Sequence, residues 1–307
     1  MHYRHVGHSG LNVSVLGLGT WGWAESTDAY EAEAILGGFL DAGGNLVDTA
    51  AHYAAGDCEQ LVGKAIEKMR HEVVIATKAG IKNSHRDTSR KNLLDTLDQS
   101  LRHLRTDVID IWQIAAWDKT TPLEETMEAI SLAASTGKVH YVGVSNFSAW
   151  QQTWFYQWAK ELGVRLISNQ VEYSLLNRSI EKDIVPASNE TGMGILAWSP
   201  LGRGVLTGKY RLTIPGDSRA ASDNSQFVEP YLPQANGPIV ESLAKAAEGL
   251  GLSMTDVALG WVLRNTAVSS AIVGARTYKQ LVELMSNSDI EIPEAIYFAL
   301  NDVSERD

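Results

Sequence analysis

The stretch "VVIATKAGIKNSHRDTSRKNLLDTLDQSLRHLRTDVIDIWQI" (residues 73–114) decides the fold, because two apolar runs flank one amphipathic segment. The runs at 73–77 and 108–114 are rich in Val and Ile and have the length of buried strands, whereas residues 90–103 repeat apolar side chains at helical spacing. Strands that are joined through a helix usually pair in parallel. The stretch therefore predicts a strand–helix–strand unit of a parallel sheet.

The same alternation continues along the whole chain. Strands are expected at 15–19, 45–49, 73–77, 108–114, 141–145, 166–170, 194–199 and 269–274. Helices are expected near 28–42, 58–69, 90–103, 122–136, 148–162, 178–190, 255–265 and 277–286. A hairpin around His8-Ser9-Gly10 precedes them. Eight strand and helix pairs predict one α/β domain over residues 1–307, a (β/α)8 TIM barrel with an N-terminal β-hairpin, and an open doubly wound sheet is the structural alternative.

Composition limits the partners and the compartment. The 307 residues are 44% hydrophobic and carry a formal net charge of -11, which disfavours nucleic acid and anionic membrane as partners. The single cysteine, Cys58, excludes an intrachain disulfide, and the N-terminal "MHYRHVGHSG" lacks the apolar core of a signal peptide. No apolar run approaches the roughly 20 residues of a spanning helix. We expect a cytoplasmic protein without nucleic-acid or membrane partners, and the oligomeric state stays open.

Two segments need separate interpretation. "GLGTWG" (17–22) satisfies the dinucleotide-binding pattern G-x-G-x-x-G, but "WAEST" separates Gly22 from the first helix-capping residue, so a strand followed by a loop is the favoured interpretation over a Rossmann fold. Residues 201–230 form a long segment rich in Gly, Ser and Arg. Such a segment in a compact domain is usually a functional lid or is disordered.

Polar side chains gather where the predicted strands end, which is the catalytic face of a TIM barrel. They are Asp48, Tyr53, Lys78, Ser145, Asn146, Gln170 and Ser199. Asp48 and Lys78 are natural partners, since neither charge should be buried alone, and a purely structural ion pair is the alternative. A tyrosine, with an ordinary pKa of about 10, is a weak acid, and a neighbouring ammonium favours its phenolate. Tyr53 beside Lys78 therefore indicates proton transfer in carbonyl reduction or alcohol oxidation.

Several motifs in this order resemble the aldo-keto reductase superfamily. They are "DTAAHY" (48–53), "ATK" (76–78), "GVSNF" (143–147), "NQVEYSLLNR" (169–178), "AWSPLGRGVLTGKY" (197–210) and "IVGARTYKQL" (272–281). The resemblance implies a TIM barrel that binds NADPH without a Rossmann fold. It also implies that Tyr53 is the proton donor, that Lys78 lowers the pKa of Tyr53, and that Asp48 pairs with Lys78.

The resemblance further implies a set of residues that bind NADPH or NADP. They are Ser145, Asn146, Gln170, Trp198, Ser199, Leu201, Arg203, Lys209, Gly274, Arg276 and Gln280. The first three would bind the nicotinamide carboxamide and Trp198 would stack on the nicotinamide. Arg203 and Lys209 would hold the pyrophosphate, and Arg276, at a helix start, the adenosine 2'-phosphate. The alternatives are a core tryptophan at 198, solvated loop side chains at 203 and 209, and a simple helix cap at 276.

The substrate pocket departs from the family pattern. Its expected residues are Trp21, Trp23, Ala115 and Tyr173. In the family a histidine that holds and polarises the carbonyl follows the "DIWQI" strand, where this chain has Ala115. Three explanations stay open: a natural variant adapted to another substrate, an engineered substitution, or a protein that binds cofactor without efficient turnover. Smaller departures are Ala54 and Ala55, where glycine is usual, and Leu284, where an asparagine often contacts adenine.

Two functions follow from this set of residues. The first is an NADPH-dependent oxidoreductase that reduces small-molecule aldehydes or ketones to alcohols by hydride transfer, with activity that is normal, impaired or altered at Ala115. The alternative is an NADPH-binding regulatory or sensor protein with little turnover, similar to the β subunits of potassium channels. No metal site is predicted.

Overall fold

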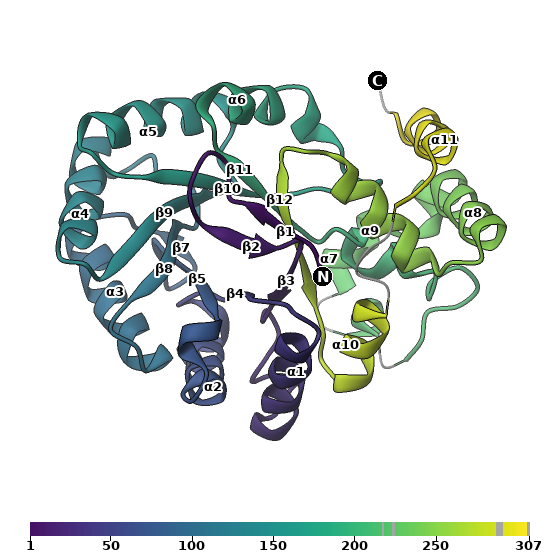
Figure 1. Ribbon diagram of the computed structural model, residues 1–307, viewed down its shortest axis with the longest axis horizontal. Coiled ribbons are helices and arrows are strands. Elements are labelled where there is room, and N and C mark those ends of the chain that lie inside the picture. Colours follow the sequence, from purple (N-terminus) through teal and green to yellow (C-terminus); the bar gives the residue numbers. More distant parts are fainter. Residues whose placement is uncertain (217, 223–224, 287–290, 306–307) are drawn as a thin grey trace.

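The chain forms a closed barrel of parallel strands in this computed structural model, which describes residues 1–216, 218–222, 225–286 and 291–305 (Figure 1). In order around the barrel the strands are β3 (Leu16–Gly19), β4 (Leu46–Asp48), β5 (Val74–Ala79), β8 (Ile109–Ile114), β9 (Val139–Ser145), β10 (Leu166–Glu172), β11 (Gly194–Trp198) and β12 (Val268–Gly274). Pairing of β12 with β3, from Ala271 opposite Leu16 to Gly274 opposite Gly19, closes the barrel. The predicted TIM barrel and all of its predicted strands are confirmed.

The predicted N-terminal hairpin is also confirmed. Strands β1 (Tyr3–His5) and β2 (Asn12–Ser14) pair antiparallel, and the hairpin lies across the barrel in Figure 1. Its Val6 and Val13 are fully buried against the apolar side chains that fill the barrel interior. Those side chains are Leu46, Ala76, Ile111, Ile167, Leu196 and Ile272. The amino end of the barrel is therefore closed by apolar packing.

Helices surround the barrel (Figure 1). They are α1 (Ala29–Asp41), α2 (Asp57–Ile66), α3 (Arg90–Leu104), α4 (Leu123–Ser135), α5 (Ala149–Glu161), α6 (Ile184–Thr191), α8 (Pro233–Leu250), α9 (Met254–Arg264), α10 (Tyr278–Met285) and α11 (Glu294–Ser304). The starts read from the sequence have a structural basis: Asp28 accepts a hydrogen bond from the Glu31 amide to begin α1, and Ser148 forms a capping box with Gln151 at α5.

The helix predicted at 178–190 is wrong in its first half. The structure has a 3₁₀ helix at Ser179–Glu181, and α6 begins only at Ile184. Pro186 explains the difference, because a proline ring clashes with the carbonyl four residues earlier and is tolerated only in the first turn of a helix. A helix that includes Pro186 therefore cannot begin much before it.

The long segment at 201–230 is not simply a loop. It contains 3₁₀ helices at Gly202–Thr207 and Arg219–Ala221 and the short helix α7 (Ser225–Val228), which a further 3₁₀ helix, Glu229–Tyr231, follows. Residues 217, 223 and 224 of the predicted lid lie outside the described residues.

A small hairpin of β6 (Ile81–Lys82) and β7 (His85–Arg86) follows β5.

The glycine motif at 17–22 belongs to the barrel. Residues 16–19 form β3, and the next helix, α1, begins ten residues later at Ala29. The structure thus supports the strand-and-loop interpretation over the dinucleotide-binding one, which requires a helix at the last glycine. None of the helices in the described parts of the chain has both the length and the apolar character that crossing a membrane requires.

Candidate active site

A buried ion pair lies at the carboxyl ends of β4 and β5. The Lys78 ammonium contacts both carboxylate oxygens of Asp48, at 2.6 and 2.8 Å, and donates to the Thr49 carbonyl at 3.0 Å. Burial by itself lowers the pKa of Lys78, but the charges of Asp48 and Tyr53 oppose it and the net direction is upward. Lys78 is therefore a permanent cation at neutral pH.

Two glutamines complete the shell around Asp48. Gln170 on β10 donates to its Oδ1 at 2.6 Å, and Gln113 on β8 donates to the same oxygen at 3.2 Å. Both side chains are buried. Gln113 was not predicted as a site residue, although the sequence contains a signal for it, since it is a polar residue inside the apolar run 108–114. In the structure it stands opposite Lys78 in the β5–β8 register. The carboxylate of Asp48 is thus held by one cation and two amides.

Tyr53 lies beside this pair on a tight turn. The Lys78 ammonium is 5.3 Å from the centre of the Tyr53 ring. Burial raises the pKa of Tyr53 and Lys78 lowers it, and the net direction is upward. The expectation that Lys78 lowers this pKa describes one contribution correctly, but in the structure burial outweighs it. Tyr53 is consequently a protonated phenol at neutral pH, as a proton donor must be.

The turn that follows Tyr53 is strained. Ala54 and Ala55 both have positive φ angles, 44° and 53°, and Gly56 continues the run at 101°. Residues with a Cβ pay about 1 to 2 kcal/mol for this left-handed conformation. The chain therefore stores backbone strain at these two alanines, directly after Tyr53.

Ala115 extends β8 into the site. Its amide donates to the Ala79 carbonyl at 2.9 Å, and its side chain is 7% exposed. Since alternate residues face the same side of a strand, Ala115 continues the inward-facing row that contains Gln113. The side chain at this position offers a methyl group and no hydrogen-bond donor.

The predicted nicotinamide-binding residues come together on β9, β10 and β11. Ser145 donates to the Gln170 carbonyl at 3.0 Å, and Asn146 donates to the Ser145 hydroxyl at 3.1 Å. The Trp198 indole N–H donates to Asn146 at 3.0 Å. The core alternative for Trp198 is not supported, because the side chain is partly exposed and forms this bond at the rim. Hydroxyl, amide and indole groups at one rim suit the amide-bearing ring of a nicotinamide.

Arg203, in the long segment at 201–230, is held by residues of β10 and α7. Its guanidinium forms a bidentate pair with Glu172 at 2.7 and 2.8 Å and donates to the Phe227 carbonyl at 2.6 Å. It also lies 4.0 Å from the centre of the Phe227 ring and 4.6 Å from that of Tyr231. Binding of a pyrophosphate by Arg203 would require this pair to open, and that role stays a prediction. Neither Glu172 nor Phe227 was predicted as a site residue from the sequence.

The remaining predicted cofactor residues lie along the same rim and beyond it. Ser199 has a left-handed φ of 50°, Leu201 is half-buried, and Lys209 is exposed.

At the start of α10 the Gln280 side chain accepts from the Arg276 amide at 2.9 Å. Gly274 is exposed, and an added Cβ there would meet nothing nearer than 3.8 Å. An open backbone beside a capped helix start fits the approach of a phosphate-bearing nucleotide. Leu284, in contrast, is a buried apolar residue of α10.

Two of the predicted substrate-pocket residues are wrong. Trp23 is fully buried and donates to the Ala275 carbonyl at 3.0 Å, so it is a core residue. Tyr173 is 1% exposed, packs on Trp261 of α9, and donates to Glu181 at 2.7 Å. Both indole and phenol groups satisfy their polar atoms inside the protein wall. Trp21 is 40% exposed and packs 5.0 Å from Phe227 between ring centres, so it remains a rim residue.

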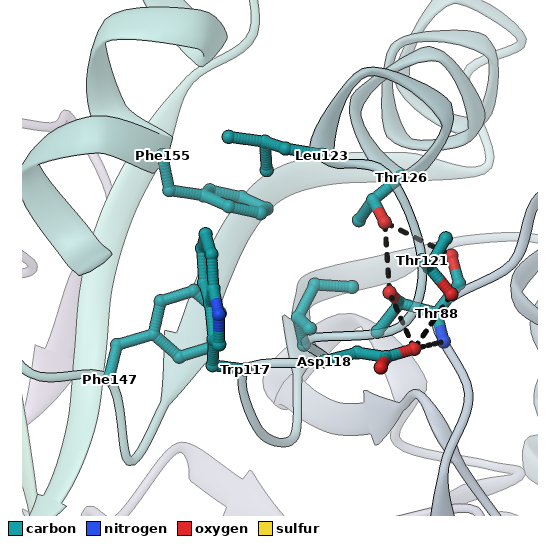
Figure 2. Close-up of a pocket in the computed structure, with 9 residues that line it drawn as sticks. Thr88, Trp117, Asp118, Thr121, Leu123, Thr126, Phe147 and Phe155 are labelled. Atoms are coloured by element: carbon teal, nitrogen blue, oxygen red, sulfur yellow. Dashed lines mark hydrogen bonds between the residues drawn. The ribbon is translucent and has the colours of Figure 1, made fainter.

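A small cavity near the rim is not the substrate site. Figure 2 shows Trp117 beside Phe147 and Phe155, with the Asp118 carboxylate turned towards Thr88. Asp118 accepts the Thr88 amide at 3.0 Å, and although burial opposes them, its hydrogen bonds lower the pKa of this carboxyl. The cavity volume is about 10 Å³. That volume holds at most one water, so Asp118 is a structural carboxylate that shapes the loop before α4.

Comparison with known proteins assigns the chain to a class of TIM-barrel oxidoreductases. The model of the Aldo/keto reductase family matches residues 15–305, and the chain belongs to that family. The chain is 37% identical to a probable voltage-gated potassium channel subunit beta of Oryza sativa subsp. japonica over 306 residues, which cover 94% of this chain and 92% of that protein. It is 34% identical to the uncharacterized oxidoreductase YrpG of Bacillus subtilis, with 99% and 96% covered. It is also 34% identical to L-glyceraldehyde 3-phosphate reductase of Escherichia coli, with 92% and 86% covered.

Proposed function

We propose that the protein is an NADPH-dependent reductase that converts aldehydes or ketones to alcohols. The observation that carries this proposal is the contact of the Lys78 ammonium with Asp48, at 2.6 Å, and with the face of Tyr53, at 5.3 Å from the ring centre. A protonated phenol beside a fixed cation is suited to give a proton to an oxygen that becomes an alkoxide. The cation would also stabilise the phenolate that this transfer leaves behind.

The residues around Tyr53 divide the chemical step among them. Tyr53 donates its hydroxyl proton to the carbonyl oxygen while hydride reaches the carbonyl carbon. Lys78 stabilises the phenolate, and Asp48, with the amides of Gln113 and Gln170, keeps Lys78 charged and in place. Solvent then returns a proton to Tyr53. Bound NADPH would supply the hydride.

The residues at the rim support the cofactor assignment. Ser145, Asn146 and Gln170 would hold the nicotinamide carboxamide, Trp198 would stack on the ring, and Arg276 would pair with the 2'-phosphate. Arginine meets a phosphate with two parallel hydrogen bonds. The expected substrate is a small-molecule carbonyl compound.

Two measurements test the reductase assignment. Oxidation of NADPH is followed by its absorbance with 4-nitrobenzaldehyde for the wild type and for Tyr53→Phe. We expect turnover in the wild type and a loss of about 10² to 10⁴ in kcat for the variant, with unchanged NADPH affinity, because only the transferable proton is removed. A Tyr53→Phe variant that keeps more than a tenth of kcat would refute the role of Tyr53.

The cofactor assignment has its own test. Arg276→Ala should weaken NADPH binding by about tenfold, which corresponds to about 1.4 kcal/mol, and leave NADH binding unchanged. Titration of tryptophan fluorescence measures both dissociation constants. Equal affinity of the wild type for the two cofactors would contradict the assignment of Arg276 to the 2'-phosphate.

A second function is favoured by one comparison. Similarity to a probable potassium channel subunit beta supports an NADPH-binding regulatory protein with little turnover. Ala115, which removes a donor from the carbonyl site, is compatible with this role. Tight NADPH binding without oxidation of the cofactor by any of a panel of aldehydes and ketones would favour it over the reductase.

A further inference from the structure

The end of β5 is flanked by two backbones that both reach the catalytic centre. On one side the loop after β4 continues the pairing, since the Ala51 amide donates to the Lys78 carbonyl at 3.1 Å. On the other side the Ala115 amide donates to the next carbonyl of the strand, that of Ala79, at 2.9 Å. Adjacent strands are about 4.8 Å apart, so the two flanking backbones are about 10 Å apart. A carbonyl bound above Lys78 is therefore accessible to side chains from either flank.

The first of these flanks carries His52, which the mechanism above does not use. His52 directly precedes Tyr53, and the two rings meet edge to face with their centres 4.9 Å apart. Its side chain is exposed at the barrel mouth. Apart from the charges of Lys78 and Asp48, the ring contact with Tyr53 is the one interaction found for it within the described ranges of the chain, and it forms no hydrogen bond there. Its ring N–H is available to a ligand.

The surroundings fix the charge state of His52. Loss of part of its hydration lowers the pKa of His52, the Lys78 ammonium lowers it further, and the Asp48 carboxylate raises it, which leaves this pKa at about 4. At neutral pH the imidazole is uncharged and donates from one nitrogen. A neutral donor beside Tyr53 does not compete with Lys78 for the phenolate.

Carbonyl reduction needs such a donor. Negative charge develops on the carbonyl oxygen, and sites that stabilise it usually provide more than one hydrogen bond. Tyr53 supplies one. Lys78 is already bound to Asp48 and to the Thr49 carbonyl, and the Ala115 side chain supplies none. Of the side chains on the two flanks, Ala51 and Ala115 have no polar group. His52 has a ring N–H that forms no hydrogen bond with the described residues.

We propose that His52 donates a second hydrogen bond to the substrate carbonyl oxygen and is a catalytic residue of this protein. The inference rests on the proposed reductase function. Hydride adds to the carbonyl carbon, the electron pair of the C=O π bond moves to oxygen, and the Tyr53 proton forms the O–H bond. His52 keeps its own proton throughout and stabilises the oxygen while the charge is present.

Variants of His52 test this proposal because they should lower turnover without changing the affinity for NADPH. His52→Ala should lower kcat/KM for 4-nitrobenzaldehyde by about 10-fold to 10²-fold, since one donor to the oxyanion is lost. Its NADPH dissociation constant and its Tm should not change. His52→Gln keeps an N–H donor and should recover part of the loss. The matched control is His71→Ala, which removes an exposed histidine at the 3₁₀ helix Arg70–Glu72, before the start of β5, and should match the wild type.

The opposite flank gives an independent check. Ala115→His, made in the His52→Ala variant, should restore kcat/KM by at least about tenfold, because it places an imidazole across β5 from the one that was removed. In the wild-type background the same substitution should gain less, since one donor is already present. Equal gains in the two backgrounds would show that His52 contributes nothing at the carbonyl.

The outcomes separate the inference from the function on which it rests. Absence of turnover in the wild type, with NADPH bound, overturns the reductase proposal and the role of His52 with it. Turnover in the wild type with His52→Ala retaining more than half of kcat/KM overturns the role of His52 alone. A His52→Gln variant no better than His52→Ala would show that the hydrogen bond is not what His52 provides.

Discussion

Two ion pairs link neighbouring strands of the barrel, one at the carboxyl ends of the strands and one at their amino ends. Lys78 and Asp48 join β5 and β4 at their carboxyl ends, and each side chain is 5% exposed. Arg70 and Asp110 lie at the amino ends of β5 and β8, with side chains 24% and 16% exposed. Both pairs are short, at 2.6 and 2.7 Å between nitrogen and oxygen. Charge pairing alone therefore does not distinguish the pair that we propose to be catalytic from the other one.

The neighbours of the two pairs do distinguish them. Arg70 donates to the Val73 and Val108 carbonyls, and Asp110 accepts the Ile75 amide, so the amino-end pair fastens backbone to backbone. It borders an open polar groove of about 460 Å³. The carboxyl-end pair is surrounded mainly by side chains instead, and one of them is the phenol of Tyr53. Both pairs have a titratable neighbour, since His140 lies 3.5 Å from Asp110. The amino-end pair, however, holds three backbone groups, whereas the carboxyl-end pair holds one, the Thr49 carbonyl. We therefore expect the first pair to serve the fold and the second to serve the proposed chemistry.

Among the tests of the difference between the two ion pairs, the largest effect is expected from substitution of Lys78. Lys78→Met should cost about 3 to 5 kcal/mol of unfolding free energy, because it leaves Asp48 as a buried charge without its cation. It should also lower kcat by more than about 10²-fold, since the phenolate of Tyr53 loses its counter-ion. Denaturant unfolding and NADPH oxidation measure the two losses.

A second substitution separates the two losses. Adding Asp48→Asn to Lys78→Met removes the uncompensated charge while keeping an oxygen for the amides of Gln113 and Gln170. We expect most of the stability to return and the activity to stay lost. If the double variant recovered turnover together with stability, the carboxyl-end pair would be as structural as the amino-end one.

The sequence was sufficient to predict the barrel, but not the helices that lie outside its repeat of strand and helix pairs. The strands are continuous apolar runs bounded by turns, which is the pattern of strands buried on both faces. Helix α8 was missed because Pro238 lies inside it, and an internal proline normally argues against a helix. Helix α11 follows the last strand and helix pair, so the repeat does not predict it.

The polar centre of the site was more predictable than its aromatic rim. Asp48 and Lys78 were identified because a buried charge requires a partner. Trp23 and Tyr173 were placed in the pocket wrongly, since an aromatic residue near a strand end has the same sequence signature whether it faces the mouth or the wall. Which way it faces depends on partners far along the chain, here the Ala275 carbonyl and Trp261.

A smaller effect is expected at the amino-end pair. Arg70→Gln should cost about 1.5 to 3 kcal/mol of unfolding free energy, because charged hydrogen bonds to Asp110 and to two carbonyls are weakened. Turnover should stay within about twofold of the wild type, as nothing that touches substrate has changed. Urea unfolding and steady-state kinetics decide this. A tenfold fall in kcat with intact folding would remove the distinction between the two pairs.

The smallest effect concerns the pH dependence of stability at the carboxyl end. Burial first, and then the charge of Lys78, lower the pKa of His52 to about 4 from an ordinary value of 6.5. Between these two pH values the unfolded chain binds a proton at His52 that the folded protein does not. Stability therefore falls as the pH drops from 6.5 towards 4, and it is unaffected by this group above 6.5.

His52→Gln removes the titrating group and should flatten this part of the stability curve. Because the ring is exposed to solvent, which screens the charge of Lys78, we expect the gain at pH 4.5 to be about 1 kcal/mol or less. Urea unfolding at pH 4.5, 5.5, 6.5 and 7.5 measures it, and above pH 6.5 the curves of variant and wild type should run parallel. A variant whose stability falls as steeply as the wild type between pH 6.5 and 4.5 would show that the folded protein does not lower the pKa of His52. The imidazole would then be a surface group that the charges of Lys78 and Asp48 do not influence, and the contrast between the two ends of the barrel would be confined to Tyr53.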